Sequence, residues 1–188
     1  TDRFGAGTEA VDPIGRRVVT TRDADGNPLQ TTQPNGVLIG YTFDARGNLT
    51  EVREGVGTAL ARSRRFEYEP IFSLVTKIVD AGGFATAIDY DAKGNIVKIT
   101  DPLNGVRSFT YNSRGQPLTM TDELGRTTSL TYDAQGNLQT VTDPLGIVTE
   151  MERNAAGEII GLIQAKGTAL QRKTTSVYDG MNRRVSLT

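Results

Sequence analysis

Hydrophobic and polar residues alternate along this chain in short segments. In residues 126–132, Thr128, Leu130 and Tyr132 fall on one face of an extended segment, and small polar side chains occupy the other face. A period of two with β-branched and aromatic residues is typical of a β-strand. The segments that follow place apolar residues three apart, as at Leu138 and Val141. This spacing breaks the period of two and predicts a β-bulge.

Turn sequences separate these segments. The clearest are Asp133-Ala134-Gln135-Gly136 and Asp143-Pro144-Leu145-Gly146, each with an acid or amide, two free positions and a glycine. Asp or Asn accepts a backbone hydrogen bond at the start of a type I turn, Pro suits the second position, and Gly takes the left-handed conformation that closes the turn. A turn of this kind beside a bulge is a common hairpin connection.

The signature recurs about every twenty-one residues between Asp12 and Asn182. An aromatic or long residue precedes the first turn of each copy, at Arg22, Phe43, Tyr68, Tyr90, Tyr111, Tyr132, Arg153 and Tyr178. The turn glycine follows at Gly26, Gly47, Gly94, Gly115, Gly136 and Gly157, and Asn182 replaces it in the last copy. Second turns are expected to begin at Asp12, Gln33, Glu54, Asp101, Asp122, Asp143 and Gln164.

Three copies depart from this pattern. Residues 69–72 keep no glycine and form the degenerate copy. Residues 57–62 and 167–172 resemble each other and mark two copies that carry four extra residues after the second turn. We expect longer hairpin arms at these two insertions.

The predicted fold is all-β: an antiparallel meander of about sixteen strands in one array, residues 1–188, with about eight repeats of roughly 21 to 25 residues. Open sheets rarely exceed ~10 strands without curling, and strand twist gives the curl a consistent direction. We therefore expect a curved, spiral sheet. Tyr90, Tyr111 and Tyr132 would lie on every second strand, roughly 9 to 10 Å apart, as a stripe that packs repeat on repeat. With 37% hydrophobic residues, one face is expected to be wet or turned toward something enclosed.

Composition narrows the function. A net charge of −1 provides no global field for nucleic acid or an anionic membrane. Among the local charges, Arg53, Arg62, Arg64 and Arg65 are read as a solvated face rather than a polyanion site. There is no cysteine, and no apolar run approaches the ~20 residues of a membrane helix. The chain starts without Met and stops inside a repeat arm, so we expect a fragment of a longer protein.

No catalytic, cofactor-binding or metal-binding residue is predicted. The absence of His and Cys excludes or weakens triads, thiol nucleophiles and the usual zinc sites. The acids recur at one turn position, unlike the paired acids in unlike environments of a glycosidase. Counting an EF-hand loop from Asp23 puts Pro28 and Pro34 where Gly and Glu are required, which leaves only a weak surface ion site as an alternative. The tyrosine stripe is read as packing, with stacking of sugars or bases as the alternative.

In these motifs the sequence resembles the YD-repeat, or Rhs, family. Two stretches carry the resemblance best: residues 132–138 followed by 143–146, and residues 90–96 followed by 101–102. The positions that match the family signature, all expected to be structural, are Tyr90, Asp91, Gly94, Tyr111, Gly115, Tyr132, Asp133, Gly136, Asp143, Pro144 and Gly146. The resemblance implies a spiral β-sheet shell, which encloses a C-terminal toxic domain in bacterial Rhs proteins and Tc toxin B and C components. Teneurins use a similar shell outside animal cells.

Two functions follow as hypotheses. The first is a structural wall segment of a Rhs or Tc-type toxin, whose partners are the toxin domain and further repeats of the same parent chain. The second is an extracellular adhesion or carbohydrate-binding module. In either case we expect a non-enzyme that is secreted or extracellular, with a cytoplasmic stage before export if it is a bacterial effector. We expect no cofactor, nucleic acid or membrane insertion. End-to-end self-association through unpaired end strands is also expected.

Overall fold

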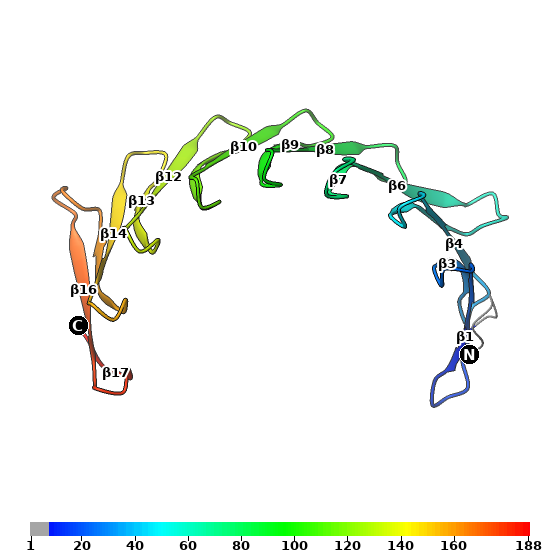
Figure 1. Ribbon diagram of the computed structural model, residues 1–188, viewed down its shortest axis with the longest axis horizontal. Helices are drawn as coiled ribbons and strands as arrows, with labels where there is room; N and C mark the ends of the chain where they lie inside the picture. The colour runs from blue at the N-terminus through cyan, green and yellow to red at the C-terminus, as the bar shows by residue number, and fades with distance from the viewer. Residues whose placement is uncertain (1–7) are drawn as a thin grey trace. The chain divides into compact units, whose positions relative to one another are not determined.

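The computed structural model describes residues 8–188, and all its regular elements are β-strands (Figure 1). Seventeen strands occur in this described stretch, and each register that the structure gives joins strands adjacent in sequence in antiparallel pairing. The strands are β1 Thr8–Val11, β2 Arg17–Arg22, β3 Pro28–Thr32, β4 Leu38–Phe43, β5 Leu49–Glu54, β6 Arg62–Tyr68, β7 Val75–Val79, β8 Ala85–Tyr90, β9 Ile96–Thr100, β10 Val106–Tyr111, β11 Pro117–Thr121, β12 Thr127–Tyr132, β13 Leu138–Thr142, β14 Val148–Arg153, β15 Ile159–Gln164, β16 Arg172–Tyr178 and β17 Arg184–Leu187. The predicted all-β antiparallel meander is confirmed.

Contacts divide the chain into two compact units, which are described separately. The first contains residues up to Asp89 together with Thr100–Asn104. The second contains Tyr90–Ile99 and Gly105–Thr188.

The predicted bulges are present beside the first turns of both units. In the hairpin β12–β13, Thr131 pairs with Thr140 but Tyr132 pairs with Leu138, so Gln139 is the extra residue. The same shift occurs in the hairpins β2–β3, β4–β5, β6–β7, β10–β11, β14–β15 and β16–β17. Because the bulge adds one residue, Leu138 and Val141 reach the same face although they are three apart. The hairpins closed by second turns show no such shift, as in β13–β14.

The two faces of the second unit differ in chemistry. Leu130 pairs with Val141 on one face. On the other face, threonine hydroxyls bond across the strands, with Thr131 Oγ1 2.7 Å from Thr140 Oγ1 and Thr121 Oγ1 2.8 Å from Thr127 Oγ1. Cross-strand threonine pairs of this kind stabilise a sheet surface.

Neither face is sealed by a second layer. Ile163 is the one buried hydrophobic side chain among residues 8–188, and Leu130 and Tyr132 are only half-buried. The apolar face therefore packs laterally, strand against strand, without forming an enclosed core.

The two insertions lengthen their hairpins as expected, but their second turns are shifted. Glu54 and Gln164, expected to open turns, are the last residues of β5 and β15. Each turn begins one residue later, where the amide of Thr58 donates to the carbonyl of Gly55 at 3.0 Å and that of Thr168 to Ala165 at 3.1 Å. The prediction was wrong here because the extra residues allow the strand pairing to extend by one step.

Candidate functional site

Within each unit the turns lie in two rows at opposite ends of the strands, the first turns in one row and the second turns in the other. We call these rows the first-turn edge and the second-turn edge. The side chains that carry the repeat signature lie in these rows.

The first turns are closed by their leading acid or amide. At Asp133 the amide of Gly136 donates to the backbone carbonyl at 3.0 Å, while one carboxylate oxygen accepts the amide of Asn137 at 2.8 Å. The other oxygen accepts the side-chain amide of Asn137 at 3.0 Å. This side-chain hydrogen bond, followed by the backbone ones, holds the pKa of Asp133 below its ordinary range. Asp91 makes the same bonds with Asn95, and its pKa is lowered for the same reason.

Outside the degenerate turn at Glu69, the side chains of the first and fifth residues of the first turns described here are matched as donor and acceptor. Where the first residue is Asn112, it donates its side-chain amide to the side-chain oxygen of Gln116 at 3.0 Å. Asn154 donates to Glu158 at 2.6 Å. A carboxylate therefore faces a donor in these turns, and an amide faces an acceptor.

Side chains on the first-turn edge also tie each repeat to its neighbour. The hydroxyl of Tyr132 donates to the carbonyl of Pro117 at 2.8 Å, and that of Tyr111 to Ile96 at 2.8 Å. Burial, with a smaller contribution from the charge of Asp91, raises the pKa of Tyr111. The stripe of tyrosines is thus engaged in repeat-to-repeat contacts.

Long side chains from the turns add further links in the second unit. Lys93 Nζ donates to the carbonyl of Ser113 at 2.9 Å, and Arg114 Nη2 donates to that of Ala134 at 3.1 Å. Gln116 Nε2 donates to the carbonyl of Gly136 at 2.6 Å. Sequence reasoning missed these links because they join residues about twenty positions apart through backbone acceptors, which leave no mark in a sequence.

The degenerate turn that begins at Glu69 is also capped by the carboxylate of its first residue, but its geometry differs from that of the other first turns. The Glu69 carboxylate accepts the amides of Ile71, Phe72 and Leu74, and Ser73 takes the left-handed conformation with a φ of 56°. The turn is one residue longer, since the Glu69 amide donates to Leu74 rather than to the fourth residue on. Glutamate, longer than aspartate by one methylene, spans that extra length.

The second-turn edge is capped in the same way but presents different side chains. Asp143 accepts the amides of Leu145 at 2.9 Å and Ile147 at 2.8 Å, and the amide of Gly146 donates to the Asp143 carbonyl at 2.9 Å. Sequence reasoning missed one such turn, at residues 80–83, where Asp80 accepts the amides of Gly82 and Phe84. The signature itself, an acid three residues before a glycine, was the signal for it.

Most second turns carry an exposed aliphatic residue at or near the tip, whereas the turns that begin at Gln33 and Asp80 carry Asn35 and Gly82 at their third position. Leu124 is 76% exposed and Leu145 86%, and Leu170 at the tip of the insertion loop is 79% exposed. In the first unit Ile14, Leu60 and Leu103 are exposed to a similar extent. The corresponding first-turn position holds Asp25, Arg46, Ile71, Lys93, Arg114, Gln135, Ala156 and Met181, of which Ile71 and Met181 are each 76% exposed. The two edges therefore differ in polarity at most of their tips.

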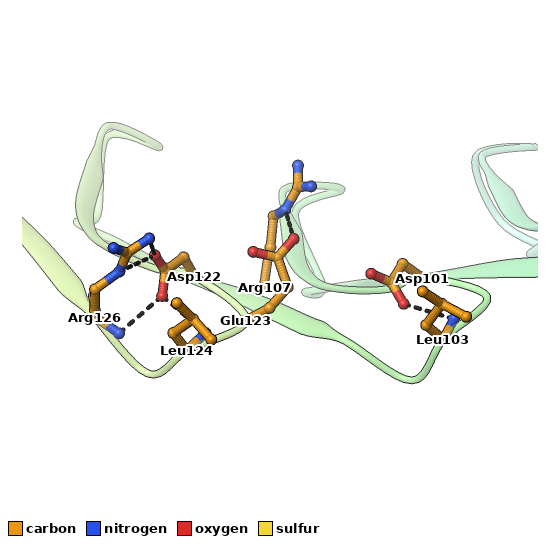
Figure 2. A network of polar contacts seen from close by, with 7 residues as sticks. All are labelled: Asp101, Leu103, Arg107, Asp122, Glu123, Leu124 and Arg126. Atoms are coloured by element: carbon orange, nitrogen blue, oxygen red, sulfur yellow. Dashed lines mark hydrogen bonds and ion pairs between the residues drawn. The ribbon is translucent and has the colours of Figure 1, made fainter.

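Ion pairs on the second-turn edge lie at the surface. Figure 2 shows Arg107 in contact with Glu123 and Arg126 with Asp122, beside Leu124 in the turn. The arginines are more than half exposed, and such pairs contribute little to stability.

The arginine group singled out from the sequence does not form one cluster. Val52 pairs with Arg64 and Glu51 with Arg65, so Arg64 and Arg65 lie on opposite faces of β6. Arg65 Nε lies 3.4 Å from Glu51 Oε1. The position of Arg64 and Arg65 on opposite faces of the strand favours the interpretation of these arginines as solvated surface residues.

Residues 8–188 contain no group of three or more His, Cys, Asp or Glu side chains placed to hold a metal ion. In the loop tested against the EF-hand pattern, the Asp23 carboxylate accepts the amides of Asp25 and Asn27, as in the other turns. The described part of the chain, residues 8–188, contains no helix that is long and apolar enough to cross a membrane.

These features define a class of protein: a single-layer array of capped β-hairpins in which hydrogen bonds along the first-turn edge link successive repeats. The RHS repeat family profile matches residues 22–59, 90–127, 111–148 and 132–169, which together cover more than half of the chain. The chain belongs to the RHS repeat family.

Solved structures share the fold. The Tc holotoxin pore of Photorhabdus luminescens with a substitution in TccC3 has a TM-score of 0.52 and 17% identity, with 96% of this chain and 11% of that chain covered. TcdB2-TccC3 without its hypervariable C-terminal region has a TM-score of 0.52 and 18% identity, with 97% and 12% covered. The complex TcdB2-TccC3-Cdc42 gives a TM-score of 0.52 at 18% identity, with 97% and 12% covered. The chain thus spans about a tenth of the length of these chains. A search of curated proteins gave no match.

Proposed function

We propose that this chain is a non-catalytic wall segment of a secreted RHS toxin, and that its repeats help to enclose a toxic domain of the same parent protein. The observation that carries the proposal is the single-layer construction in a member of the RHS repeat family. A sheet with half-buried side chains on its apolar face and a hydrogen-bonded threonine face is stabilised laterally. It can separate two compartments without a second layer behind it.

The distribution of acids supports a structural role. Asp91, Asp133 and Asp143 are occupied by backbone amides of their own turns. A general acid or base needs a group that is free to exchange a proton with a substrate. The tyrosine hydroxyls likewise donate to carbonyls of neighbouring repeats, which supports packing over the carbohydrate-binding alternative.

The test is a local lesion in the parent protein. Gly136→Val, at a turn whose glycine has a φ of 93°, should open the wall at one hairpin. Gln135→Val is the matched control, since residue 135 lies next to Gly136 in the same turn but needs no positive φ. Limited proteolysis of the downstream domain and toxicity to target cells are then compared. Faster cleavage and altered toxicity are expected for Gly136→Val alone. Equal shielding in both variants and in a deletion of residues 90–169 would reject enclosure and favour the adhesion module, which a glycan-binding assay would then examine.

A further inference from the structure

The two insertion loops are held by the same hydrogen bonds. In the first loop the amide of Val56 donates to the carbonyl of Leu38 at 3.1 Å, and the hydroxyl of Thr58 donates to the carbonyl of Gly55 at 2.8 Å. The equivalent groups of the second loop make the corresponding bonds at 2.9 and 2.8 Å. Side chains that differ between the two insertions are therefore not required by the loop conformation.

The strands beside the loops carry different side chains. In the first unit Glu54 pairs with Arg62, and Arg64 lies on the same face of β6 as Arg62. Phe66 follows on that face, because alternate residues of a strand point to the same side. Alignment of the two registers shows that the positions of Glu54, Arg64 and Phe66 are occupied in the second unit by Gln164, Thr174 and Ser176. A carboxylate, a guanidinium and an aromatic ring are thus specific to the first insertion.

These side chains line two adjoining grooves of the first unit. The cationic groove, of about 300 Å³, is lined by Arg62, Arg64, Phe66 and Ala81. The aliphatic groove, of about 650 Å³, is lined by Asn35, Val37, Val56 and Leu60. Since Ala81 follows β7 and Asn35 precedes β4, the grooves extend to opposite sides of the β5–β6 pair. Glu54 and Arg62 line both grooves and so lie at their junction.

The charged side chains at this junction have no partner among residues 8–188. Glu54 and Arg62 are paired in register, yet no hydrogen bond or ion pair joins the side chains of Glu54, Arg62 or Arg64 to another group of that stretch. Arg65, on the opposite face, lies 3.4 Å from Glu51. Two guanidinium groups and one carboxylate beside an aliphatic groove are thus free to bind an external group of complementary charge.

An extended polypeptide complements this arrangement. Its backbone amides can donate to the Glu54 carboxylate, and its carbonyls can accept from the Arg62 guanidinium. An aliphatic side chain fits the aliphatic groove, and an acidic side chain can accept two hydrogen bonds from Arg64. The grooves lie about two strand spacings apart, roughly 10 Å, which about three residues of extended chain span. A folded repeat does not fit, since its backbone groups are already paired within hairpins.

We propose that the first insertion is a docking site for an extended polypeptide segment in which about three residues separate an aliphatic side chain from acidic ones. Arg62 and Arg64 are solvated in the free chain and bind the segment, while Arg65 faces away from it. The requirement for the aliphatic groove distinguishes this site from a general polyanion site. The inference goes beyond the enclosing role and does not depend on it, because the site lies within the first unit alone.

The experiment measures fluorescence anisotropy of a labelled eight-residue peptide titrated with the 188-residue chain. In this peptide two serines separate a leucine from a pair of glutamates. One control peptide has lysines in place of the glutamates, and another has serine in place of the leucine. Arg64→Thr introduces the residue found at the equivalent position of the second unit, so the variant is expected to fold. Arg65→Thr is the matched control, because it makes the same change at the next residue on the opposite face. Urea melts establish that both variants are folded.

The glutamate peptide should bind the unmodified chain, and Arg64→Thr should weaken that binding about tenfold through loss of a charge-assisted hydrogen bond. Replacing the leucine should also weaken it about tenfold. Arg65→Thr should change it by less than about twofold, and the lysine peptide should not bind. No binding at ~1 mM, equal losses in the two arginine variants, or undiminished binding without the leucine would each overturn the proposal.

Two competitors test other occupants of the grooves. Hexanoate can satisfy Arg64 but does not reach across both grooves, so it should displace the peptide only at concentrations at least about tenfold above those of unlabelled peptide. Displacement at equal concentrations would assign the site to small carboxylates. Phosphatidylserine vesicles should not compete, and Arg64-dependent competition by them would assign the site to a lipid surface. Either result would overturn the assignment to a polypeptide.

Discussion

The two edges of the array share a capping scheme and differ in what they do with their remaining side chains. At the first-turn edge Tyr132 and Gln116 reach the backbone of the adjacent repeat. At the second-turn edge Leu124 and Leu145 project into solvent. The same turn chemistry therefore serves internal cohesion on one side and outward presentation on the other. Substitutions should separate these roles, because cohesion appears in unfolding measurements and presentation does not.

The largest effect is expected at the cohesive edge. Gly136 has a φ of 93°, and a Cβ there would lie 3.0 Å from Arg114 Nη1. A residue forced into the left-handed region costs ~1 to 2 kcal/mol, and a β-branched one costs more. Gly136→Val should therefore lower the free energy of unfolding by about 2 kcal/mol or more in a urea melt. Gln135→Val should change it by about 0.5 kcal/mol or less. Equal losses would contradict the turn geometry.

Removing one inter-repeat hydrogen bond should have a smaller effect. Tyr132→Phe deletes the hydroxyl that donates to Pro117 and leaves the ring in place. The expected loss is about 1 kcal/mol of unfolding free energy. Tyr41→Phe serves as the control, because the Tyr41 hydroxyl has no hydrogen-bond partner among residues 8–188. If both variants lose the same stability, the hydroxyl link does not couple the repeats.

The two insertion loops on the second-turn edge allow the same turn position to be compared with glycine and with alanine. Gly55 and Ala165 occupy equivalent positions with φ values of 68° and 50°. Ala165→Gly removes the strain but adds backbone entropy to the unfolded chain, so a net gain of about 0.5 kcal/mol is expected. Gly55→Ala should destabilise by about 1 kcal/mol, since its Cβ would also lie 3.1 Å from Thr58 Oγ1. Changes of the same sign in both loops would show that they are not equivalent.

The pH dependence of capping is the subtlest prediction. Hydrogen bonds keep the folded-state pKa values of Asp91 and Asp133 below the value of about 3.9 for unfolded Asp. Their stabilisation is therefore fully present above that pH and is lost as pH falls through the lowered folded-state values. In Asp133→Asn the side-chain oxygen can still accept the backbone amides, as Asn112 does, but no longer titrates. Urea melts between pH 2 and 6 should show a shallower acid loss in this variant; an unchanged profile would assign the loss to other groups.

The sequence predicted the strands, turns and bulges well because each depends on neighbouring residues. Leu138 and Val141 revealed the bulge through their spacing, and Asp133 and Gly136 specified the turn. The shifted turn at Gly55 could not be read from local signals, because strand pairing with β4 competes with the expected turn and wins. The polar contrast between the tips at Gln135 and Leu145 was available in the sequence but required alignment of the first turns against the second turns.

The acceptors of the inter-repeat links have a consequence for how such genes change. Tyr132, Lys93 and Arg114 all donate to backbone carbonyls, which every repeat supplies whatever its side chains. The matched partners of each turn cap, such as Asp133 and Asn137, lie within five consecutive residues and are inherited together. Unequal recombination that duplicates or deletes a whole repeat therefore breaks none of these links. Array length can vary between descendants without compensating substitutions at the new junction.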